Sequence, residues 1–261
     1  MIRLSTAALA AALAVMPAGA DALDAGQTFV TEYAFSLLGL PLGVSHFESS
    51  VQGDRFTVEG TVRSAGLARL FDSTVAQSRV EGRLTGDGLA PETYAMSYVS
   101  GDRKRSTELT FRNSDVVATR LIPKPPRGER LVPVTAEHLK AVSDPMTAGI
   151  VRAASPQAVC QRSLRVFDGR MRMDIVLSDP KPEQVDVSGY RGPAVTCKAR
   201  FIPVAGYRKG KKAIEFLRDN DDITVTFARR GSTDIYAPVK ASVPTMIGRL
   251  RISATRFGPA E

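Results

Sequence analysis

Residues 55–62 read RFTVEGTV and alternate without a break between two kinds of side chain. The apolar or small set is Phe56, Val58, Gly60 and Val62, and the polar set is Arg55, Thr57, Glu59 and Thr61. Because successive side chains of an extended chain point to opposite faces, this period of two predicts a β-strand with one buried face.

The same period recurs through the rest of the first half of the chain. One face of residues 92–100 would carry Tyr94, Met96 and Tyr98, and one face of residues 105–113 would carry Thr107, Leu109 and Phe111. Turn signals separate these runs at Gly53, at Gly86-Asp87-Gly88 and at Gly101-Asp102. Turns at such short and even intervals are typical of an antiparallel meander.

The middle of the chain has a different composition. Residues 123–133 contain four prolines and are typical of a loop or linker. Two helices are predicted after it, at residues 135–142 and 143–155. Thr135 suits the cap of the first helix, and Asp144 followed by Pro145 suits the start of the second. Met146, Ile150 and Val151 would then share one helical face.

From residue 159 the chain returns to β-like runs, including a hairpin at residues 162–179 with Asp168-Gly169 as its two-residue turn. We therefore expect a mostly β fold: a single long curved antiparallel sheet, either a β-spiral or an incomplete barrel, wrapped around one or two mid-chain helices. Residues 24–122 would supply the N-terminal strands, 123–158 the linker and helices, and 159–258 the C-terminal strands. Neither half closes its own sheet edges, which favours one domain over residues 21–261.

Residues 1–20 have the features of a secretory signal peptide. Arg3 precedes the apolar run at 4–16, and Pro17 is followed by the triplet Ala18-Gly19-Ala20. We expect cleavage between Ala20 and Asp21 and export to the bacterial periplasm. The alternative, a buried alanine-rich helix, fits the Pro-x-x-Ala ending less well. The apolar run is too short to cross a bilayer, and no later segment resembles a membrane span.

The chain contains two cysteines, Cys160 and Cys197, both within β-like runs. An even count in an exported protein favours one disulfide between them. On the chain-entropy model such a bridge contributes about 3–4 kcal/mol. A catalytic thiol is the alternative, and it is disfavoured because neither cysteine belongs to a C-x-x-C pair.

The formal charge is 35 − 27 = +8, and removal of Arg3 leaves +7. Export argues against nucleic acid as the partner of this charge. The anionic surfaces that remain are lipid headgroups, lipopolysaccharide phosphates and wall polymers. The basic residues occur in four runs, at 101–105, 124–130, 207–212 and 228–230. We interpret these runs as solvated turns and strand edges rather than as one binding patch.

Several segments together resemble a known family. They are EYAFSLLGLPLGVSHFE, GLARLF with the strands after it, SDPMTAGIVRA, VFDGRMRMDI and IYAPVKASVPTMIGRLR. In order and spacing they are similar to a family of exported bacterial proteins catalogued as domain of unknown function 3108. That family is similar in layout to the β-spiral envelope-integrity proteins. The resemblance runs from about Thr31 to Phe257. It implies a fold and a compartment, and it brings no catalytic residues.

No pattern of residues indicates an active site. His46 and His138 are isolated, without a G-x-S-x-G elbow or an H-x-x-x-H pair, so we expect structural or solvent-facing roles for both. Residues 218–222, RDNDD, lack the ligand spacing of a calcium loop and are interpreted as a polar turn. We therefore expect no catalytic residue, no metal and no cofactor.

Two interpretations of function remain. The first is a non-catalytic envelope protein that binds a peptide, a lipid or a cell-wall component and supports envelope integrity. The second is a periplasmic carrier of a hydrophobic ligand, similar to the lipoprotein carriers, with the mid-chain helices as a lid. An uncharacterised hydrolase ranks third. An open apolar pocket on the concave face of the sheet would distinguish the second from the first.

Overall fold

The computed structural model describes residues 28–66, 73–86, 88–125, 128 and 130–260. The predicted leader at 1–20, with its cleavage site between Ala20 and Asp21, lies outside the described residues.

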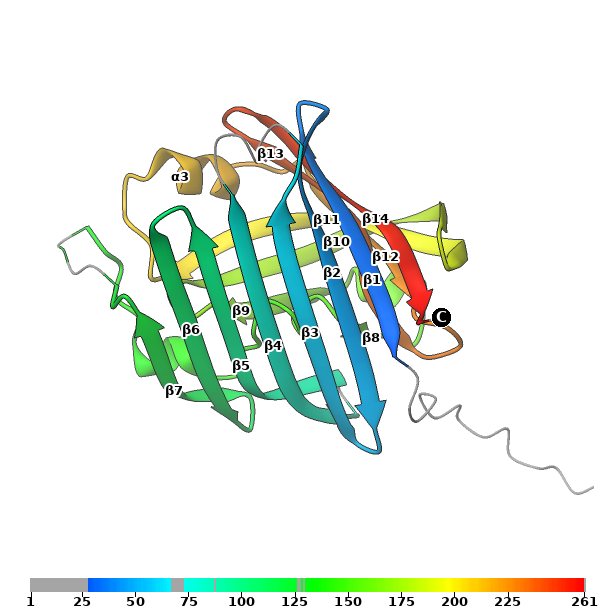
Figure 1. The fold of residues 1–261 in the computed structure, drawn as a ribbon, viewed down its shortest axis with the longest axis horizontal. Coiled ribbons are helices and arrows are strands. Elements are labelled where there is room, and N and C mark those ends of the chain that lie inside the picture. The colour runs from blue at the N-terminus through cyan, green and yellow to red at the C-terminus, as the bar shows by residue number, and fades with distance from the viewer. Residues whose placement is uncertain (1–27, 67–72, 87, 126–127, 129, 261) are drawn as a thin grey trace, which may run out of the picture.

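The first half of the chain is an antiparallel meander (Figure 1). Its strands are β1 (Phe29–Leu37), β2 (Leu40–Gln52), β3 (Arg55–Ser64), β4 (Thr74–Thr85), β5 (Gly88–Ser100), β6 (Arg103–Arg112) and β7 (Asp115–Ile122). Each strand pairs with the next in sequence. The turn signals thus fall where the sequence predicted, although Asp87 of the second lies outside the described residues.

The second half adds the remaining strands and the helices. They are a 3-10 helix η1 (Ala136–Leu139), β8 (Val151–Arg152), α2 (Pro156–Val159), β9 (Arg162–Phe167), β10 (Arg172–Val187), β11 (Tyr190–Ala205), α3 (Lys212–Arg218), β12 (Ile223–Arg229), β13 (Ile235–Thr245) and β14 (Gly248–Pro259). The last strand of the chain, β14, pairs with the first strand, β1, and β13 to β9 then follow β14 across the sheet in descending order. The helix α3 is absent from the sequence-based expectation.

All the strands belong to one sheet. Its order is β7-β6-β5-β4-β3-β2-β1-β14-β13-β12-β11-β10-β9, with β8 attached to β13. The two end strands, β7 and β9, do not pair with each other, so the sheet stays open. Figure 1 shows that it is strongly curved. The predicted fold class, a single long curved antiparallel sheet, is confirmed.

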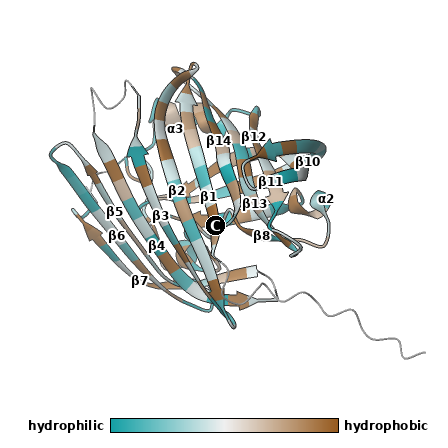
Figure 2. Cartoon of the chain, turned by 45° about the vertical axis from the view of Figure 1, so that its right-hand side comes forward, coloured by the Kyte–Doolittle hydropathy of each residue, from teal (hydrophilic) through white to brown (hydrophobic). Residues whose placement is uncertain are grey.

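The alternation in residues 55–62 has the predicted consequence. Phe56, Val58 and Gly60 of β3 are buried, while Arg55 and Glu59 on the other face are exposed. The hydropathy colouring of Figure 2 shows the same banding along the neighbouring strands. A period of two therefore identified the buried face of this half of the sheet.

The concave face of the first half is largely filled by the mid-chain segment. Val142 and Phe167 are buried there against β2 to β7, and Val134, Leu139, Met146 and Ile150 pack beside them. The strand residues in this cluster are Val51, Phe56, Val58, Val80, Tyr94, Leu109, Phe111 and Val116. The sheet is thus wrapped around residues 134–150, as predicted, but these residues are not helical in the predicted way.

The helix predicted at residues 143–155 is wrong. Asp144 does act as a cap: its Oδ1 accepts hydrogen bonds from the backbone N–H groups of Met146 (2.8 Å) and Thr147 (3.1 Å). Turns follow at 145–149, and Val151 then enters β8 and pairs with Tyr236 of β13. The local capping signal is real, but strand pairing with a distant segment prevails over helix propagation. The helix predicted at 135–142 is reduced to the 3-10 helix η1.

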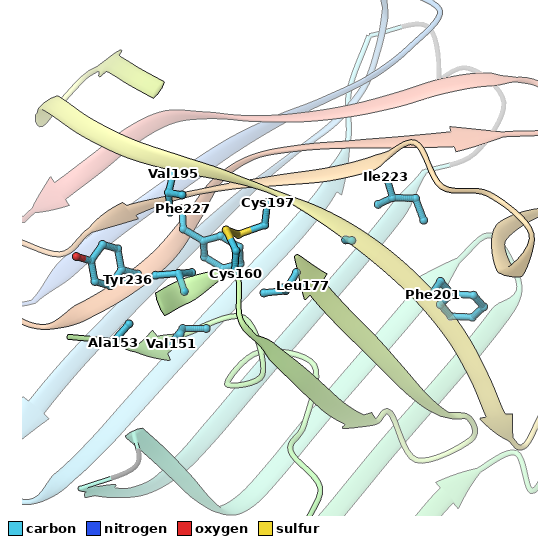
Figure 3. Packing of buried hydrophobic residues seen from close by; sticks show 12 residues of the cluster. Val151, Ala153, Cys160, Leu177, Val195, Cys197, Phe201, Ile223, Phe227 and Tyr236 are labelled. Atoms are coloured by element: carbon cyan, nitrogen blue, oxygen red, sulfur yellow. A yellow bond between two sulfur atoms is a disulfide. The ribbon is translucent and has the colours of Figure 1, made fainter. Parts of the chain in front are cut away.

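The predicted disulfide between Cys160 and Cys197 is present, with an S–S distance of 2.01 Å (Figure 3). It joins the end of α2 to β11. Both cysteines are completely buried, in a cluster with Leu177, Val195 and Phe227. This cluster is the core of the second half of the sheet. A disulfide in such a core favours an extracytoplasmic compartment. Among the described residues, no helix has the length and apolarity needed to cross a membrane.

Candidate functional site

Three of the four basic runs lie at one end of the molecule. Alternate strands of a meander run in the same direction, so the ends of β5 and β7 lie together. Residues 101–105 form the β5–β6 turn and the start of β6, and the described residues of the run at 124–130, which are 124, 125, 128 and 130, follow β7. Residues 207–212 connect β11 to α3 and lie beside the second run, because the backbone N–H of Lys209 donates to the carbonyl oxygen of Arg130 (2.8 Å). We call the end of the sheet where these three runs lie the pocket end, after the cavity described below.

The fourth run, at 228–230, is separate and turns partly inward. The guanidinium carbon of Arg230 lies 4.2 Å from the ring centroid of Phe29, and its Nη2 donates to Ser49 Oγ (2.8 Å). Burial lowers the pKa of Arg230 to about 10. This arginine therefore packs against the junction of the two halves and is not part of the pocket end.

The pocket end contains an apolar cavity of about 510 Å³. Its apolar walls are Leu131, Val134, Leu139, Phe167, Met171 and Ile214. They come from the mid-chain segment, the β9–β10 turn and α3, and Thr119 of β7 closes one side. The cavity is thus bounded by segments that are far apart in the sequence.

Three cationic side chains also line this cavity: Arg170, Arg208 and Lys211. Arg170 donates from Nη2 to the carbonyl oxygen of Pro123 (2.8 Å). None of the three forms an ion pair with a described residue, and none of the described residues that line the cavity is acidic. The cavity therefore combines apolar walls with positive charge that the described part of the chain does not neutralise.

The β9–β10 turn holds Arg170 and Met171 in place. It contains four residues, Asp168 to Met171, and not the two that the sequence predicted. Asp168 Oδ1 accepts hydrogen bonds from the backbone N–H groups of Arg170 and Met171, both at 2.7 Å. Gly169 has a φ of 93°, and a Cβ there would lie 2.5 Å from the methyl group of Thr107. The turn is therefore pressed against β6, and a side chain at residue 169 would displace it.

The opposite wall also depends on a glycine. Gly206, at the end of β11, has a φ of 81°, and a Cβ would lie 1.8 Å from the carbonyl oxygen of Arg170. Its backbone N–H donates to the carbonyl oxygen of Val132 (2.8 Å). Only glycine permits this close approach. It brings the β9–β10 turn, the mid-chain segment and the start of residues 207–212 together around the cavity.

Asp144 and Tyr94 are buried outside the lining of the cavity. Asp144 is buried beside Thr147, and burial raises the pKa of its carboxyl group, although three hydrogen bonds from Met146 and Thr147 oppose this shift. Burial also raises the pKa of Tyr94, with a smaller effect of Asp144. Asp144 stabilises the turn at residues 145–149 through these hydrogen bonds, and neither group lines the cavity.

A second, shallower depression of about 570 Å³ lies over β2 to β6 and is polar. Its charged residues include His46, Glu48, Glu59 and Arg79. Arg79 bonds Glu59, and His46 bonds Glu48 through Nε2 (2.9 Å). Glu108, which also lines the depression, lies 3.6 Å from Arg120. The depression is therefore a ladder of cross-strand ion pairs, which stabilises register.

The two histidines lie apart from each other and from the cavity walls. His46 is on the exposed face of β2, between Glu32 and Glu48. His138 belongs to η1, and its Nδ1 accepts a hydrogen bond from the backbone N–H of Thr135 (3.1 Å). In residues 218–222, Asp219 pairs with Arg218 and Asp222 pairs with Arg249. Among the described residues, no group of His, Cys, Asp or Glu side chains is arranged to bind a metal ion.

Sequence reasoning missed the cavity as a site. Phe167, Arg170 and Met171 were assigned only to a hairpin, and Ile214 to no element. One signal was available: residues 213–217, AIEFL, follow the basic run at 207–212 with apolar residues at helical spacing. That signal indicates a half-buried helix beside a cationic loop.

The fold and the cavity define a class: open, single-sheet β proteins with a disulfide-linked core and a cation-lined apolar pocket. A family model described as "Protein of unknown function (DUF3108)" matches residues 28–255. The chain belongs to this family. Among solved structures, it is similar to the crystal structure of a β-barrel-like protein of domain of unknown function DUF1849 from Brucella abortus. The TM-score is 0.47 at 9% sequence identity, and the match covers 90% of this chain and 98% of the other. No curated protein matches the chain.

Proposed function

We propose that this protein is a non-catalytic binding protein of the bacterial envelope that takes up an amphiphilic anion at the pocket end. The ligand would be a single acyl chain that ends in a carboxylate or a phosphate. The leader at residues 1–20 would direct it to the periplasm. This combines the two interpretations from the sequence, because the ligand is a lipid and the binding site is an apolar pocket.

One observation carries the proposal: an apolar cavity lined by Arg170, Arg208 and Lys211, whose charges meet no described carboxylate. A volume of about 510 Å³ suits a small ligand, since such pockets span about 300–1,000 Å³. An acyl chain would contact Leu139, Phe167 and the other apolar walls. The anionic head would accept charge-assisted hydrogen bonds from the three cations.

The lining favours binding over turnover. Its described residues include the hydroxyl groups of Thr119 and Tyr207 but no histidine, cysteine or carboxylate that would act as base or nucleophile. Envelope integrity, the role expected from the sequence, would then follow from capture or transfer of an envelope lipid.

Titration calorimetry with laurate, lysophosphatidylglycerol and the neutral analogue dodecanol tests the proposal. We expect both anions to bind, and dodecanol to bind about ten-fold more weakly because it lacks the charge-assisted hydrogen bonds. Ile214→Trp should fill the cavity and weaken laurate binding by about ten-fold or more. Val117→Trp is the matched control, since Val117 is 51% exposed on β7.

Equal binding of laurate and dodecanol, or unchanged laurate binding by Ile214→Trp, would contradict the proposed site. Mass spectrometry of the recovered ligand tests the non-catalytic assignment, which fails if the ligand is converted. N-terminal sequencing of protein from the periplasmic fraction tests export. The chain should begin at Asp21, and retention of residues 1–20 would contradict it.

A further inference from the structure

Two neighbouring hairpins expose large apolar side chains at their ends. The residues are Leu38 (70% exposed) and Leu40 (55%) at the β1–β2 turn, and Met246 (55%) and Ile247 (72%) at the β13–β14 turn. We call these four residues the hairpin tips. Because β1 pairs with β14 up to Leu37 and Leu250, the two turns lie side by side (Figure 1).

The first turn carries a conformational cost as well. Leu38 has a φ of 52°, in the left-handed region that bulky residues seldom adopt and that asparagine or glycine tolerates more easily. Its side chain lies over Gly248 of the neighbouring hairpin, where a Cβ would come within 2.5 Å of Leu38 Cδ2. Leu38 is strained and, apart from this contact with Gly248, largely exposed to water, so we look for its partner outside the chain.

The surroundings of the hairpin tips are basic. Arg63 of β3 and Arg251 of β14 are exposed near this end and form no ion pair with any described residue. In the loop after α3, Asp219 and Asp222 are each paired with an arginine, whereas Asp221 is exposed and forms no ion pair with a described residue. The tips are therefore apolar points flanked by two unpaired arginines and one unpaired aspartate.

We propose that the hairpin tips dock onto the surface of an anionic phospholipid bilayer. The four apolar side chains would insert at the boundary between headgroups and acyl chains, and Arg63 and Arg251 would contact lipid phosphates. Two narrow protruding turns suit insertion between lipid headgroups better than they suit a flat protein interface. This inference does not depend on a ligand in the cavity.

The geometry adds a consequence. The ends of β1, β5 and β7 share one end of the sheet, so the hairpin tips and the cavity lie at the same end. The helix α3 connects them: Ile214 lines the cavity, and the loop after α3 contacts β14 through Asp222 and Arg249. A protein docked by its tips would thus present the pocket end toward the bilayer.

Flotation with vesicles of phosphatidylglycerol or of phosphatidylcholine tests the docking. We expect binding to phosphatidylglycerol that weakens with salt and about ten-fold weaker binding to phosphatidylcholine. The double variant Leu38→Asn/Ile247→Asn should reduce binding to phosphatidylglycerol by about ten-fold or more, because two inserted side chains are lost. Its melting temperature should stay equal or rise, because asparagine tolerates the backbone of residue 38. Val117→Asn is the exposed apolar control and should bind normally.

The chain contains no tryptophan, so Ile247→Trp supplies a single fluorescent reporter. Its emission should shift to the blue on addition of phosphatidylglycerol vesicles, while that of Val117→Trp should not. Unchanged vesicle binding by the double variant would overturn the proposal. The proposal would also be overturned if the wild-type protein failed to bind vesicles and instead formed a dimer that the double variant dissociates. Ile214→Trp should bind vesicles normally, which separates a failure of docking from a failure of the pocket.

Discussion

The two ends of the first half of the sheet use arginine in opposite ways. At the end with the β2–β3 turn, Arg55 bonds Glu92 (2.7 Å), and Arg83 bonds both Glu92 (2.8 Å) and Asp54 (2.7 Å). We call these four residues the network end. At the pocket end, Arg170, Arg208 and Lys211 surround an apolar cavity without a described carboxylate partner.

This difference separates charges that serve the fold from charges that are available to a ligand. At the network end, each cation joins strands across the sheet, and the charges cancel locally. At the pocket end, the three cations form no ion pair with a described residue, and in the proposed function a bound anion would offset their charge. Net charge alone does not distinguish the two ends, whereas the pairing of each side chain does.

The largest expected effect comes from removing the disulfide. Cys160→Ser/Cys197→Ser opens a link between residues 37 positions apart and should lower the free energy of unfolding by about 3–4 kcal/mol. The melting temperature should fall by about 10 °C. Hydrogen exchange should accelerate in β9 to β11, next to the cavity, and not in the strands of the network end. Uniform acceleration over the whole sheet would show that the two ends are not independent. The wild-type protein under reducing conditions is the control.

Charge reversal at the pocket end should have the next largest effect, on binding rather than on stability. Arg170→Glu/Lys211→Glu should weaken laurate binding by about a hundred-fold, which corresponds to about 2.7 kcal/mol, and change dodecanol binding little. The matched control is Arg55→Glu/Arg83→Glu, which makes the same change of charge at the network end. Calorimetry distinguishes the ends. Equal losses of laurate affinity in both variants would mean that long-range electrostatics alone causes the effect, and would remove the basis for a specific site.

The sequence predicted the strands of the first half of the sheet well and the cavity at the pocket end poorly. The alternation at Phe56 and Val58 identified the buried face, because strand periodicity is local. The cap at Asp144 was also recognised, but the helix after it was wrong, because the pairing of Val151 with Tyr236 is set by a distant strand. The cavity depends on contacts among residues 131–139, 167–171 and 206–214, and no spacing along the chain encodes them. For the same reason, basic runs interpreted as separate solvated turns converge at the pocket end.

A smaller effect is expected from breaking the network end. The hydrogen bond from Arg83 lowers the pKa of Glu92, with further contributions from Arg55. Glu92→Gln removes this charge, but the side chain of Glu92 is 38% exposed, and solvent screens the interaction. The melting temperature should fall by about 1–2 °C at neutral pH. The difference should shrink as the pH falls below 4.5 and vanish only below the lowered pKa of the folded state, where the wild-type carboxylate is protonated. Laurate affinity should stay unchanged, and a loss of affinity would contradict the division between the ends.

The smallest effect concerns His46, which lies between the two ends on the exposed face. Hydrogen bonds to Glu48 and then Glu32 raise its pKa above 6.5. A raised pKa in the folded state means that protonation stabilises the fold. This contribution is fully present below pH 6.5 and is lost as the pH rises through the raised value. His46→Gln should therefore lower the melting temperature only on the acidic side and match the wild type at alkaline pH. The difference stays within about 1 kcal/mol, because the side chain is 46% exposed. A difference that grows with pH would mean that the neutral imidazole is the stabilising form, and that Glu32 and Glu48 do not hold a charged ring between them.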